Sequence, residues 1–432
     1  MSKRWSRIVP PLMCVAALGA CSSSKPSTFD DDAGDAGSST APDGSNPFPS
    51  KDSGSSNGSC SVTDVNADMD KDGWTPAQGD CNDCDPNVNP GAIDVLHTSD
   101  GGAPTWGDED CSGTPGDSAQ PCDTSLALGS VDPKDGAKSI ELCRTATDTD
   151  RKYGVISAAY VRADGAPNST PGLQVGIKSS WGANVKTRAG TNLLALSSGH
   201  ARAVGDPGAC NAVSCITNQV AKPPTGFPQN DPSCPIVNTI FDDIALELKI
   251  RVPTNATGYS FDFKFHSFEF PDYVCDKSGW NDEFVALVNP APSGSYVPNG
   301  SQFGNISFDG ANHPVSVNIG FFDVCDPASP QRFASNCKTG GGPCPALPMP
   351  YCPLGLTDLV GTGFDVWHNS IGPGGATRWL RSQAPAAGGT IITVRFAIWD
   401  AGNAKFDSTV LIDNFQWLAT PGVSVATAPP PN

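Results

Sequence analysis

The sequence predicts an all-β protein, an antiparallel β-sandwich or jelly roll with disulfide-rich loop insertions. Short runs rich in β-branched and aromatic residues recur between turns over residues 123–420. The chain has 46 Gly and 40 Pro to supply those turns, and few segments show helical periodicity. The clearest strand is FDFKFHSFEF at 261–270, where apolar and polar residues alternate. Its apolar face slips by one residue near His266, as at a β-bulge.

The N-terminal segment predicts export and a lipid anchor. Basic residues come first, an apolar run follows, and the run ends in Leu18-Gly19-Ala20-Cys21. This ending resembles a bacterial lipobox, so residues 1–21 are expected to be a lipoprotein signal peptide and Cys21 the lipidated residue. The mature chain would then be held to the bacterial outer membrane by lipid, facing the periplasm or the cell exterior.

Residues 22–59 consist mainly of Ser, Gly, Asp and Pro with almost no apolar side chains. Such a segment cannot bury enough surface to offset its ordering entropy, so we expect a disordered linker that acts as a stalk. The last residues, 421–432, are likewise expected to be a disordered tail. The predicted sandwich lies between, over 123–420, after a small module at 60–122.

The cysteine content fits an oxidising compartment. The chain has 16 Cys, and an exported chain with so many is expected to be stapled by disulfides. Two inserts rich in Cys, Pro and Gly, 205–236 and 323–353, are the expected disulfide-rich loops. Zinc is the competing interpretation for Cys81 and Cys84, but the next cysteines are too far apart to complete a four-Cys site.

Residues 68–94 carry the densest group of candidate ligands. Asp68, Asp70 and Asp72 alternate before Gly73, which reproduces the first half of a calcium loop. The twelfth-position Glu of an EF-hand is replaced by Gly79, so the remaining ligands should come from the acidic cluster that follows. The predicted calcium ligands are Asp68, Asp70, Asp72, the Trp74 carbonyl, Asp80, Asp83 and Asp85. The competing interpretation is a solvated acidic loop.

The overall charge agrees with cation binding. The formal net charge is −18, which argues against nucleic acid and anionic lipid as partners. Residues 60–122 have little apolar content, so a fold there should depend on metal and disulfides. We therefore predict a small calcium-binding knot at 60–122, hereafter the N-terminal module, with Ca²⁺ as the cofactor because its donors are oxygens.

Two stretches of sequence resemble known families. The order D-x-D-x-DGW, then GDCND-x-DP, then DEDCSG at 108–113 resembles the MopE-related metal-binding motif of bacterial surface proteins. That resemblance implies a disulfide between Cys81 and Cys111, while Cys84 departs from the motif.

The segments FDFKFHSFEFPDY, NDEF and AIWDAGNAKFDSTVLI, within about 150–420, resemble the choice-of-anchor L domain. This second resemblance implies a β-sandwich displayed at the cell surface, whereas the activity of that family is largely unassigned.

Carboxylates at predicted strand ends could form a second metal site. The hypothesised ligands are Glu269, Asn281, Asp282 and Asp400, and the competing interpretation is that these residues cap turns. A hydrolytic pair could be formed from Glu269 with Asp282 or Glu283. Ser198 and His200 are too close in sequence to face each other as nucleophile and base. We assign no catalytic residue.

These features predict a calcium-binding lipoprotein of the cell surface that acts as a binding or adhesion module and is not an enzyme. Its expected partner is an unidentified extracellular protein or glycan. The alternatives are a hydrolase acting on extracellular polysaccharide and a structural component of the envelope or matrix. A cleft at Glu269 and Asp282 would favour the hydrolase, and a flat polar surface the structural component.

Overall fold

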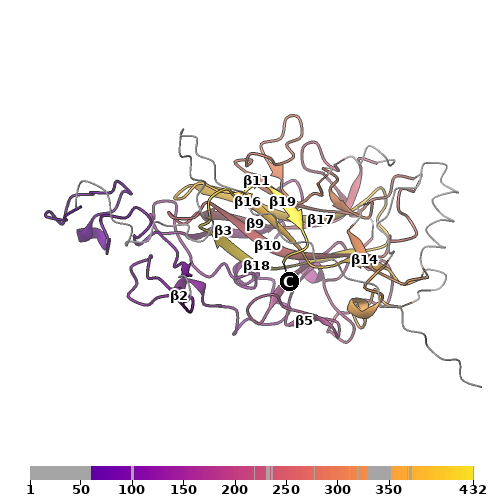
Figure 1. Ribbon diagram of the computed structural model, residues 1–432. Coiled ribbons are helices and arrows are strands. Elements are labelled where there is room, and N and C mark those ends of the chain that lie inside the picture. The colour runs from indigo at the N-terminus through magenta and orange to yellow at the C-terminus, as the bar shows by residue number, and fades with distance from the viewer. Residues whose placement is uncertain are drawn as a thin grey trace, which may run out of the picture. The chain divides into compact units, whose positions relative to one another are not determined.

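Two antiparallel β-sheets lie face to face and form the centre of the structure (Figure 1). The computed structural model describes residues 60–98, 102–217, 219–229, 234, 237–276, 278–310, 312–318, 321–328, 352–366, 368 and 372–431. The expected signal peptide, the lipidation residue Cys21 and the linker at 22–59 lie outside the described residues. The lipid anchor therefore stays a prediction from the sequence.

Sheet I contains eight strands within the described residues. Its main path, from edge to edge, is β14 (Phe322–Val324), β15 (Gly375–Thr377), β10 (Gly258–Ser267), β18 (Ser408–Leu418), β7 (Leu193–Ser197) and β4 (Val175–Lys178). β16 (Leu380–Pro385) also pairs with β10, on the same side as β15, and β19 (Ala426–Ala428) pairs with β16. These two strands therefore extend sheet I on that side.

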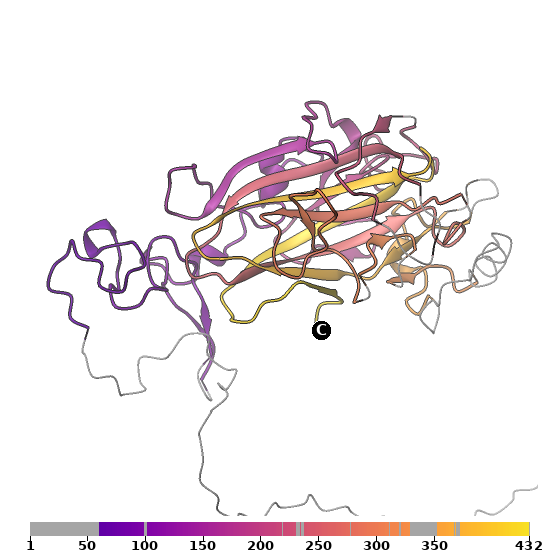
Figure 2. The same cartoon turned by 90° about the horizontal axis from the view of Figure 1, so that it is seen from above.

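Sheet II contains seven strands within the described residues. Its main path is β12 (Gly304–Asn305), β11 (Glu283–Asn289), β17 (Ile391–Ala401), β9 (Ile240–Arg251) and β3 (Gly154–Val161). β13 (Val315–Ser316) pairs with β11, and β8 (Val220–Ala221) pairs with β9. The pairings in both sheets are antiparallel, and the long strands run alongside one another in Figure 2.

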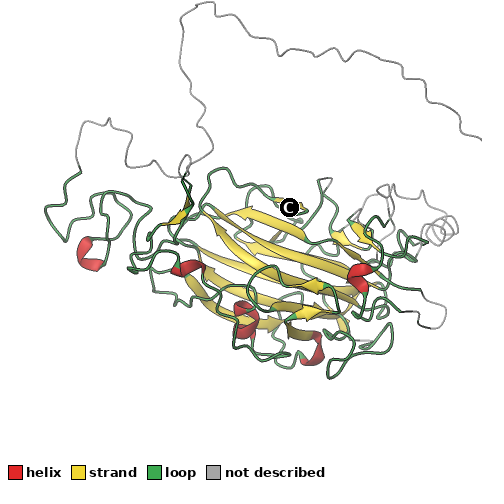
Figure 3. Cartoon of the chain, turned by 60° about the horizontal axis from the view of Figure 1, so that its bottom comes forward, coloured by secondary structure: helices red, strands yellow, loops and turns green. Residues whose placement is uncertain are grey.

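The other elements are short. Two hairpins join β1 (Leu96–His97) to β2 (Thr105–Trp106) and β5 (Ser180–Trp181) to β6 (Val185–Lys186). The helical elements are α1 (Pro133–Lys138) and the 3₁₀ turns η1 (Pro76–Gln78), η2 (Asp117–Ala119), η3 (Gly172–Gln174) and η4 (Thr357–Leu359). They lie outside the sheets (Figure 3). In the described part of the chain, no helix has the length and apolar character needed to cross a membrane.

The core lies between the two sheets. Phe261 and Phe263 of β10 point toward sheet II, where their rings meet Phe396 of β17 and Phe284 of β11, with centroid separations of 4.8 and 4.9 Å. All four side chains are fully buried. These aromatic and β-branched strands form because their alternating side chains fill a pleated, buried face. The predicted all-β sandwich with disulfide-rich loops is thus confirmed.

Simple alternation predicts that the polar face of β10 is exposed to solvent. In the structure, this face is also buried. Lys264 is fully buried, and its Nζ lies 2.8 Å from a carboxylate oxygen of Asp358 in η4. Asp262 is held by arginines, and His266 lies beside the ring of Phe364. Loops from distant segments therefore cover the outer face of sheet I. The irregular register with β18 falls between Ser260 and Asp262, not at the predicted bulge near His266.

Disulfides and loops tie the N-terminal module to the sandwich. The boundary predicted after residue 122 is crossed by the Cys122–Cys143 disulfide. The Asn255 side chain, in the turn between β9 and β10, accepts the Ile93 N–H at 2.9 Å and donates to the Ile93 carbonyl at 2.8 Å. The described residues consequently belong to one compact unit.

The predicted inserts also contain disulfides. Cys210–Cys215 closes a short loop in the first insert, and Cys325–Cys352 closes a longer loop in the second. Cys234–Cys275 joins the first insert to the turn that follows β10.

The chain end is a correction to the sequence prediction. Residues 426–428, expected to be part of a disordered tail, form β19 on the edge of sheet I. The strand is held there because the Thr427 hydroxyl is buried and lies 2.7 Å from the Ser382 hydroxyl of β16.

Candidate metal-binding sites

The acidic loop of the N-terminal module is folded by its own aspartates. Asp68 accepts the N–H groups of Lys71 at 2.7 Å and Gly73 at 3.0 Å, while Asp72 accepts the Trp74 N–H at 2.6 Å. Such side chain-to-backbone bonds stabilise consecutive turns. Gly73 has φ of +96°, a left-handed conformation that glycine adopts readily. Asp70 accepts the Asp72 N–H at 3.2 Å. One oxygen of Asp70 and one of Asp72 thus shape the loop, and their second oxygens accept no hydrogen bond within the described residues.

The carboxylates of this loop converge. Asp68, Asp70 and Asp72 each place one carboxylate oxygen within 4.8 Å of the others, and Asp70, Asp80 and Asp83 form a second such group. Asp80 and Asp83 are 5% and 2% exposed. One buried oxygen from each of four aspartates in these groups, the Oδ2 of Asp70, Asp72, Asp80 and Asp83, accepts no hydrogen bond within the described residues.

The electrostatics of this cluster are unfavourable without a cation. Burial raises the pKa of Asp70 to about 6, and the neighbouring Asp72, Asp80 and Asp68 carboxylates add to the increase. Burial is also the main cause of the raised pKa values of Asp72 and Asp80. Arg151 and the Asn89 side chain partly offset the rise at Asp72. A divalent cation bound among these oxygens would neutralise their mutual repulsion.

Two of the predicted ligands have other contacts. Asp85 lies outside both oxygen groups, and its Oδ1 accepts the backbone N–H of Asn87 at 3.1 Å and its side-chain amide at 3.0 Å. The indole of Trp74 is buried, and its ring centroid lies 4.2 Å from the guanidinium carbon of Arg151. The Trp74 carbonyl remains a predicted ligand, whereas Asp85 is better described as a turn-forming residue.

Sequence reasoning missed one residue at this site. The Asn89 side chain lies close enough to Asp72 to lower its pKa, and its Oδ1 accepts the Thr254 hydroxyl at 2.8 Å. Asn89 therefore connects the acidic loop to the sandwich. Its only signal in the sequence is its position within the MopE-like segment.

A third acidic group in the module is neutralised by the protein itself. Asp94, Asp110 and Asp117 lie together, but Arg144 forms ion pairs with both Asp110 and Asp117. This contact also links the module to the segment before β3. An arginine in this position supplies the positive charge that a metal would otherwise provide.

The cysteines of the module form disulfides. Cys81 is bonded to Cys111, the pair that the family resemblance implied, and Cys84 is bonded to Cys60. Neither sulfur of the Cys81-x-x-Cys84 segment is free to bind zinc as a thiolate. The two bridges close the segment that carries the aspartates.

A second acidic cluster lies at one end of the sandwich. Glu269 follows β10, Asp282 precedes β11, Asp400 is in β17 and Asp407 precedes β18. These positions are neighbours because Ser267 of β10 pairs with Ser408 of β18, and Glu283 of β11 pairs with Trp399 of β17. Strands of both sheets thus contribute to this cluster, which we call the sandwich cluster.

Hydrogen bonds within the sandwich cluster cross from one sheet to the other. The Asp282 backbone N–H donates to Glu269 Oε2 at 3.2 Å. Asp282 in turn accepts the Ala401 N–H at 3.1 Å and the Ser408 hydroxyl at 2.6 Å. Because Ala401 belongs to sheet II and Ser408 to sheet I, the Asp282 carboxylate bridges the two sheets.

Burial raises the pKa of every member of the sandwich cluster. The pKa values of Glu269, Asp282 and Asp400 lie well above their ordinary range, first because of desolvation and then because of repulsion within the cluster. The pKa of Asp407 is raised to about 8, chiefly by burial. Ser198 partly offsets the effect at Asp400.

The predicted second metal site needs one correction. Asn281 turns its side-chain oxygen to the Asn318 N–H, 3.2 Å away, and that bond holds a neighbouring loop. Glu269, Asp282 and Asp400 lie near one another, with Asp407 as a fourth carboxylate, but no three of these four place oxygens within 4.8 Å of one another. Asp407 was outside the predicted set because its distance from the other three in the sequence gives no sign of contact.

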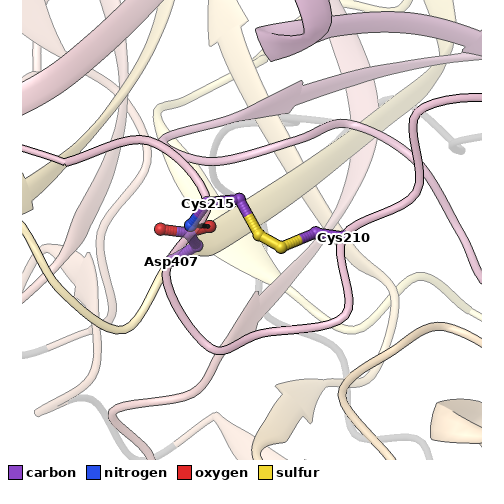
Figure 4. A group of neighbouring side chains, drawn as sticks. All are labelled: Cys210, Cys215 and Asp407. Atoms are coloured by element: carbon purple, nitrogen blue, oxygen red, sulfur yellow. Dashed lines mark hydrogen bonds between the residues drawn. A yellow bond between two sulfur atoms is a disulfide. The ribbon is translucent and has the colours of Figure 1, made fainter.

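Asp407 is positioned by a disulfide loop. Its Oδ2 accepts the Cys215 N–H at 2.8 Å, and Figure 4 shows Cys215 joined to Cys210 beside it. Both sulfurs are in the disulfide, so this group is not a thiolate metal site. Gly199 leaves room for the carboxylate, since a Cβ there would lie 1.7 Å from Asp407 Oδ2.

The candidate hydrolytic residues do not line an open cleft. Glu269, Asp282 and Glu283 are fully buried, so a polysaccharide cannot reach them in this structure. Ser198 exchanges hydrogen bonds with the Ser408 backbone, while His200 contacts the Gly208 carbonyl. The serine and histidine therefore engage different partners.

A polar hollow is found on another part of the sandwich. Its lining includes Arg162, Asn168, Thr170, His200 and Gln219, and it has a volume of about 360 Å³. The lining contains no aromatic ring other than the imidazole of His200. Trp399 is fully buried in the sandwich and therefore cannot stack on a sugar.

Comparisons with known proteins leave the chain without an assigned family. No family model and no curated protein matches it. Among solved structures, the K2 cleaved adhesin domain of Lys-gingipain (Kgp) is similar at 11% sequence identity and a TM-score of 0.22. The match covers 60% of this chain and 87% of that one. A likeness of this size carries no inference about the function of the chain.

Proposed function

We propose that this protein is a calcium-binding surface lipoprotein that acts as a binding or adhesion module. The observation that carries the calcium part is the set of inward-facing Oδ2 atoms from Asp70, Asp72, Asp80 and Asp83, which accept no hydrogen bond within the described residues. Carboxylate oxygens held at loop turns are the ligands that calcium prefers.

The donor set favours calcium over softer metals. The two oxygen groups consist of aspartates alone, and the nearby Cys81 and Cys84 are in disulfides. Soft or borderline metals are usually bound by imidazole or thiolate, whereas calcium takes six to eight oxygens. Water and backbone carbonyls, including that of Trp74, would complete the coordination.

Calcium would act in this module as a structural element. Among the described residues of 60–122, the buried hydrophobic side chains are Trp74 and Ala92. A segment with so small a core depends on disulfides and metal for its stability. Bound calcium would stiffen the module at the base of the sandwich, between the sandwich and the linker expected at 22–59.

The binding or adhesion part rests on this order of segments. A lipid anchor at Cys21, a long polar linker and a rigid sandwich would together present the sandwich to ligands away from the membrane. We propose an extracellular glycan or protein as the ligand. The polar hollow beside Thr170 and Gln219 suits a small polar group such as one sugar unit.

The calcium part is tested by titration of the full chain after chelator treatment. The double variant Asp70→Asn and Asp83→Asn should lose at least tenfold in calcium affinity at this site, because two inward oxygens become neutral amides. Asp85→Asn is the matched control, since Asp85 lies in the same loop but outside the oxygen groups. Equal affinity in the double variant and the wild type would overturn the proposal.

The adhesion part is tested separately. The full chain, prepared without its lipid, would be added to extracellular polysaccharide that contains no membrane vesicles and to immobilised matrix protein. Each binding experiment would be done in calcium and in EGTA. Retention that depends on calcium and is weakened by Thr170→Trp, which would fill the hollow, supports the proposal. If the chain is retained by neither material, the adhesion proposal is contradicted, whereas the calcium result stands.

A further inference from the structure

We propose that the sandwich holds its own divalent cation, of the calcium class, among Glu269, Asp282, Asp400 and Asp407. This site is separate from the N-terminal module and goes beyond the function proposed above. It would clamp sheets I and II together at the end of the sandwich where β10 and β17 finish and β11 and β18 begin.

The first argument is the buried oxygens that have no donor. Asp400 is fully buried, and within the described residues neither of its oxygens accepts a hydrogen bond of ordinary geometry. Glu269 Oε1 and Asp407 Oδ1 are in the same condition. These four oxygens come from three different chain segments, and their carboxylates lie near enough to Asp282 and to one another for their charges to repel. Within the described residues no three of these carboxylates bring oxygens within 4.8 Å of one another, so a bound cation would draw them closer together. Buried polar atoms are normally satisfied, so a set of this kind indicates a missing partner.

The second argument is the lack of a compensating cation. Among the ion pairs of the described residues, none includes a member of the sandwich cluster. Asp262 of β10 is equally buried, yet it accepts hydrogen bonds from Arg188 and from Arg381. The protein therefore supplies arginine to one buried carboxylate and nothing comparable to four others close together. An uncompensated buried charge is costly, and a bound cation removes that cost.

The third argument is that the oxygens are held in position. Glu269 and Asp407 each use one oxygen to accept a backbone N–H, from Asp282 and Cys215, and leave the other oxygen free. The N-terminal cluster has the same arrangement. Asp282 uses both of its oxygens to bridge Ala401 and Ser408. We therefore expect Asp400, Glu269 and Asp407 to be the principal ligands, and Asp282 to position them and share its remaining lone pairs.

The alternative occupant of this site is the proton. Carboxylic acids sharing protons could also relieve the repulsion, and a calcium-dependent measurement separates the two. The experiment uses the full chain carrying Asp70→Asn and Asp83→Asn, so that calcium at the N-terminal module binds at least tenfold more weakly and is distinguished by its affinity. Bound calcium is measured by equilibrium dialysis, and the melting temperature of the sandwich is followed in calcium and in EGTA.

The expected result is calcium binding in this background, with a melting temperature about 5 °C or more higher in millimolar calcium. Adding Asp400→Asn, or separately Glu269→Gln, should abolish both the binding and the shift. Glu283→Gln is the matched control, because Glu283 is equally buried beside Asp282 but interacts with Gln229 outside the cluster. It should keep both effects.

Two outcomes would overturn the proposal. The first is that the background protein binds no calcium at millimolar concentration, which leaves protons as the occupant. The second is that it binds calcium equally well with Asp400→Asn and with Glu269→Gln, which places the ion elsewhere. Neither outcome bears on the N-terminal module, whose calcium is tested by its own variants.

Discussion

The two acidic clusters have similar chemistry in different surroundings. In the N-terminal module, the aspartates lie in short turns of one local segment, with the buried hydrophobic side chains Trp74 and Ala92 nearby. In the sandwich, the carboxylates come from the ends of four strands in two sheets and are packed around a large apolar core. The first cluster would need its cation in order to fold. The second is assembled by strand pairing, and its cation would stabilise a fold that already exists.

A second comparison concerns two equally buried carboxylates. The side chains of Asp262 and Asp400 are both fully buried and shielded from water. Asp262 is compensated by Arg188 and Arg381, with Arg381 Nε 2.6 Å from its Oδ1. Asp400 has no comparable partner among the described residues. Burial alone therefore does not decide whether a carboxylate stabilises the protein, since the sign depends on what compensates it.

Substitution at these two positions should have opposite effects. Asp262→Asn should lower the free energy of unfolding by about 2–4 kcal/mol, because two arginines lose their charged partner. Asp400→Asn in EGTA should be neutral or stabilising, because it removes a buried charge that has no partner. Urea denaturation of both variants gives the two values. A large loss for Asp400→Asn in EGTA would contradict the comparison.

Removal of calcium should separate the module from the sandwich. At free calcium 100-fold above the dissociation constant, the stabilisation lost on chelation is about 2.7 kcal/mol. We expect protease cuts to appear within 60–122 in EGTA while the long strands β3, β9, β10, β11, β17 and β18 stay protected. Mass spectrometry of the fragments locates the cuts, and repeating the digestion after calcium is restored is the control. An N-terminal module equally resistant in both conditions would show that its disulfides suffice.

The buried carboxylates of Glu141 and Asp413 predict that the stability of the protein depends on pH. Burial, with repulsion from Asp413 and Asp123, raises the pKa of Glu141 to about 9, and burial raises the pKa of Asp413 to about 7. Asp413 also faces Asp262 and accepts the Arg188 N–H, and Glu141 accepts the Asn414 N–H. The folded state thus keeps a proton that the unfolded chain loses near its ordinary pKa. The free energy of unfolding should therefore fall as pH rises from the ordinary pKa of each carboxyl to its raised pKa in the folded state.

The variant Glu141→Gln should weaken that fall. In EGTA, it should be more stable than the wild type by about 1–2 kcal/mol at pH 8, and by less at pH 5, which lies close to the ordinary pKa of Glu, so that the unfolded chain gains little from ionising the carboxyl. Urea denaturation at the two pH values gives the difference. A stabilisation that is the same at pH 5 and pH 8 would exclude titration of Glu141 as its cause.

The smallest predicted effect concerns the contact between the module and the segment before β3. Arg151 lies over the Trp74 ring and donates to Gln78 at 3.1 Å. Arg151→Ala should destabilise the module by about 0.5–1 kcal/mol, the usual size of an exposed cation–π contact. The rate of proteolysis within 60–122 in calcium measures this, with Lys152→Ala as a neighbouring control. A rate unchanged by Arg151→Ala would show that the contact adds no stability.

The sequence was informative where a pattern is local. The alternation in 261–270 predicts a strand, and alternate aspartates before Gly73 predict convergent oxygens. Contacts between distant segments could not be predicted in this way. Nothing in the order of residues places Asp358 against Lys264, or a disulfide loop against Asp407. The turn hydrogen bonds of Asp85 and Asn281 could not be predicted either, because spacing does not show which way a turn directs a side chain.

The most direct test of the account is bound calcium per chain, measured by equilibrium dialysis against free calcium. We predict binding in the wild type, less in the variant Asp70→Asn with Asp83→Asn, and a further loss when Asp400→Asn is added to that variant. Glu283→Gln added instead should cause no further loss. Absence of bound calcium in the wild type at millimolar concentration would contradict the account for both clusters.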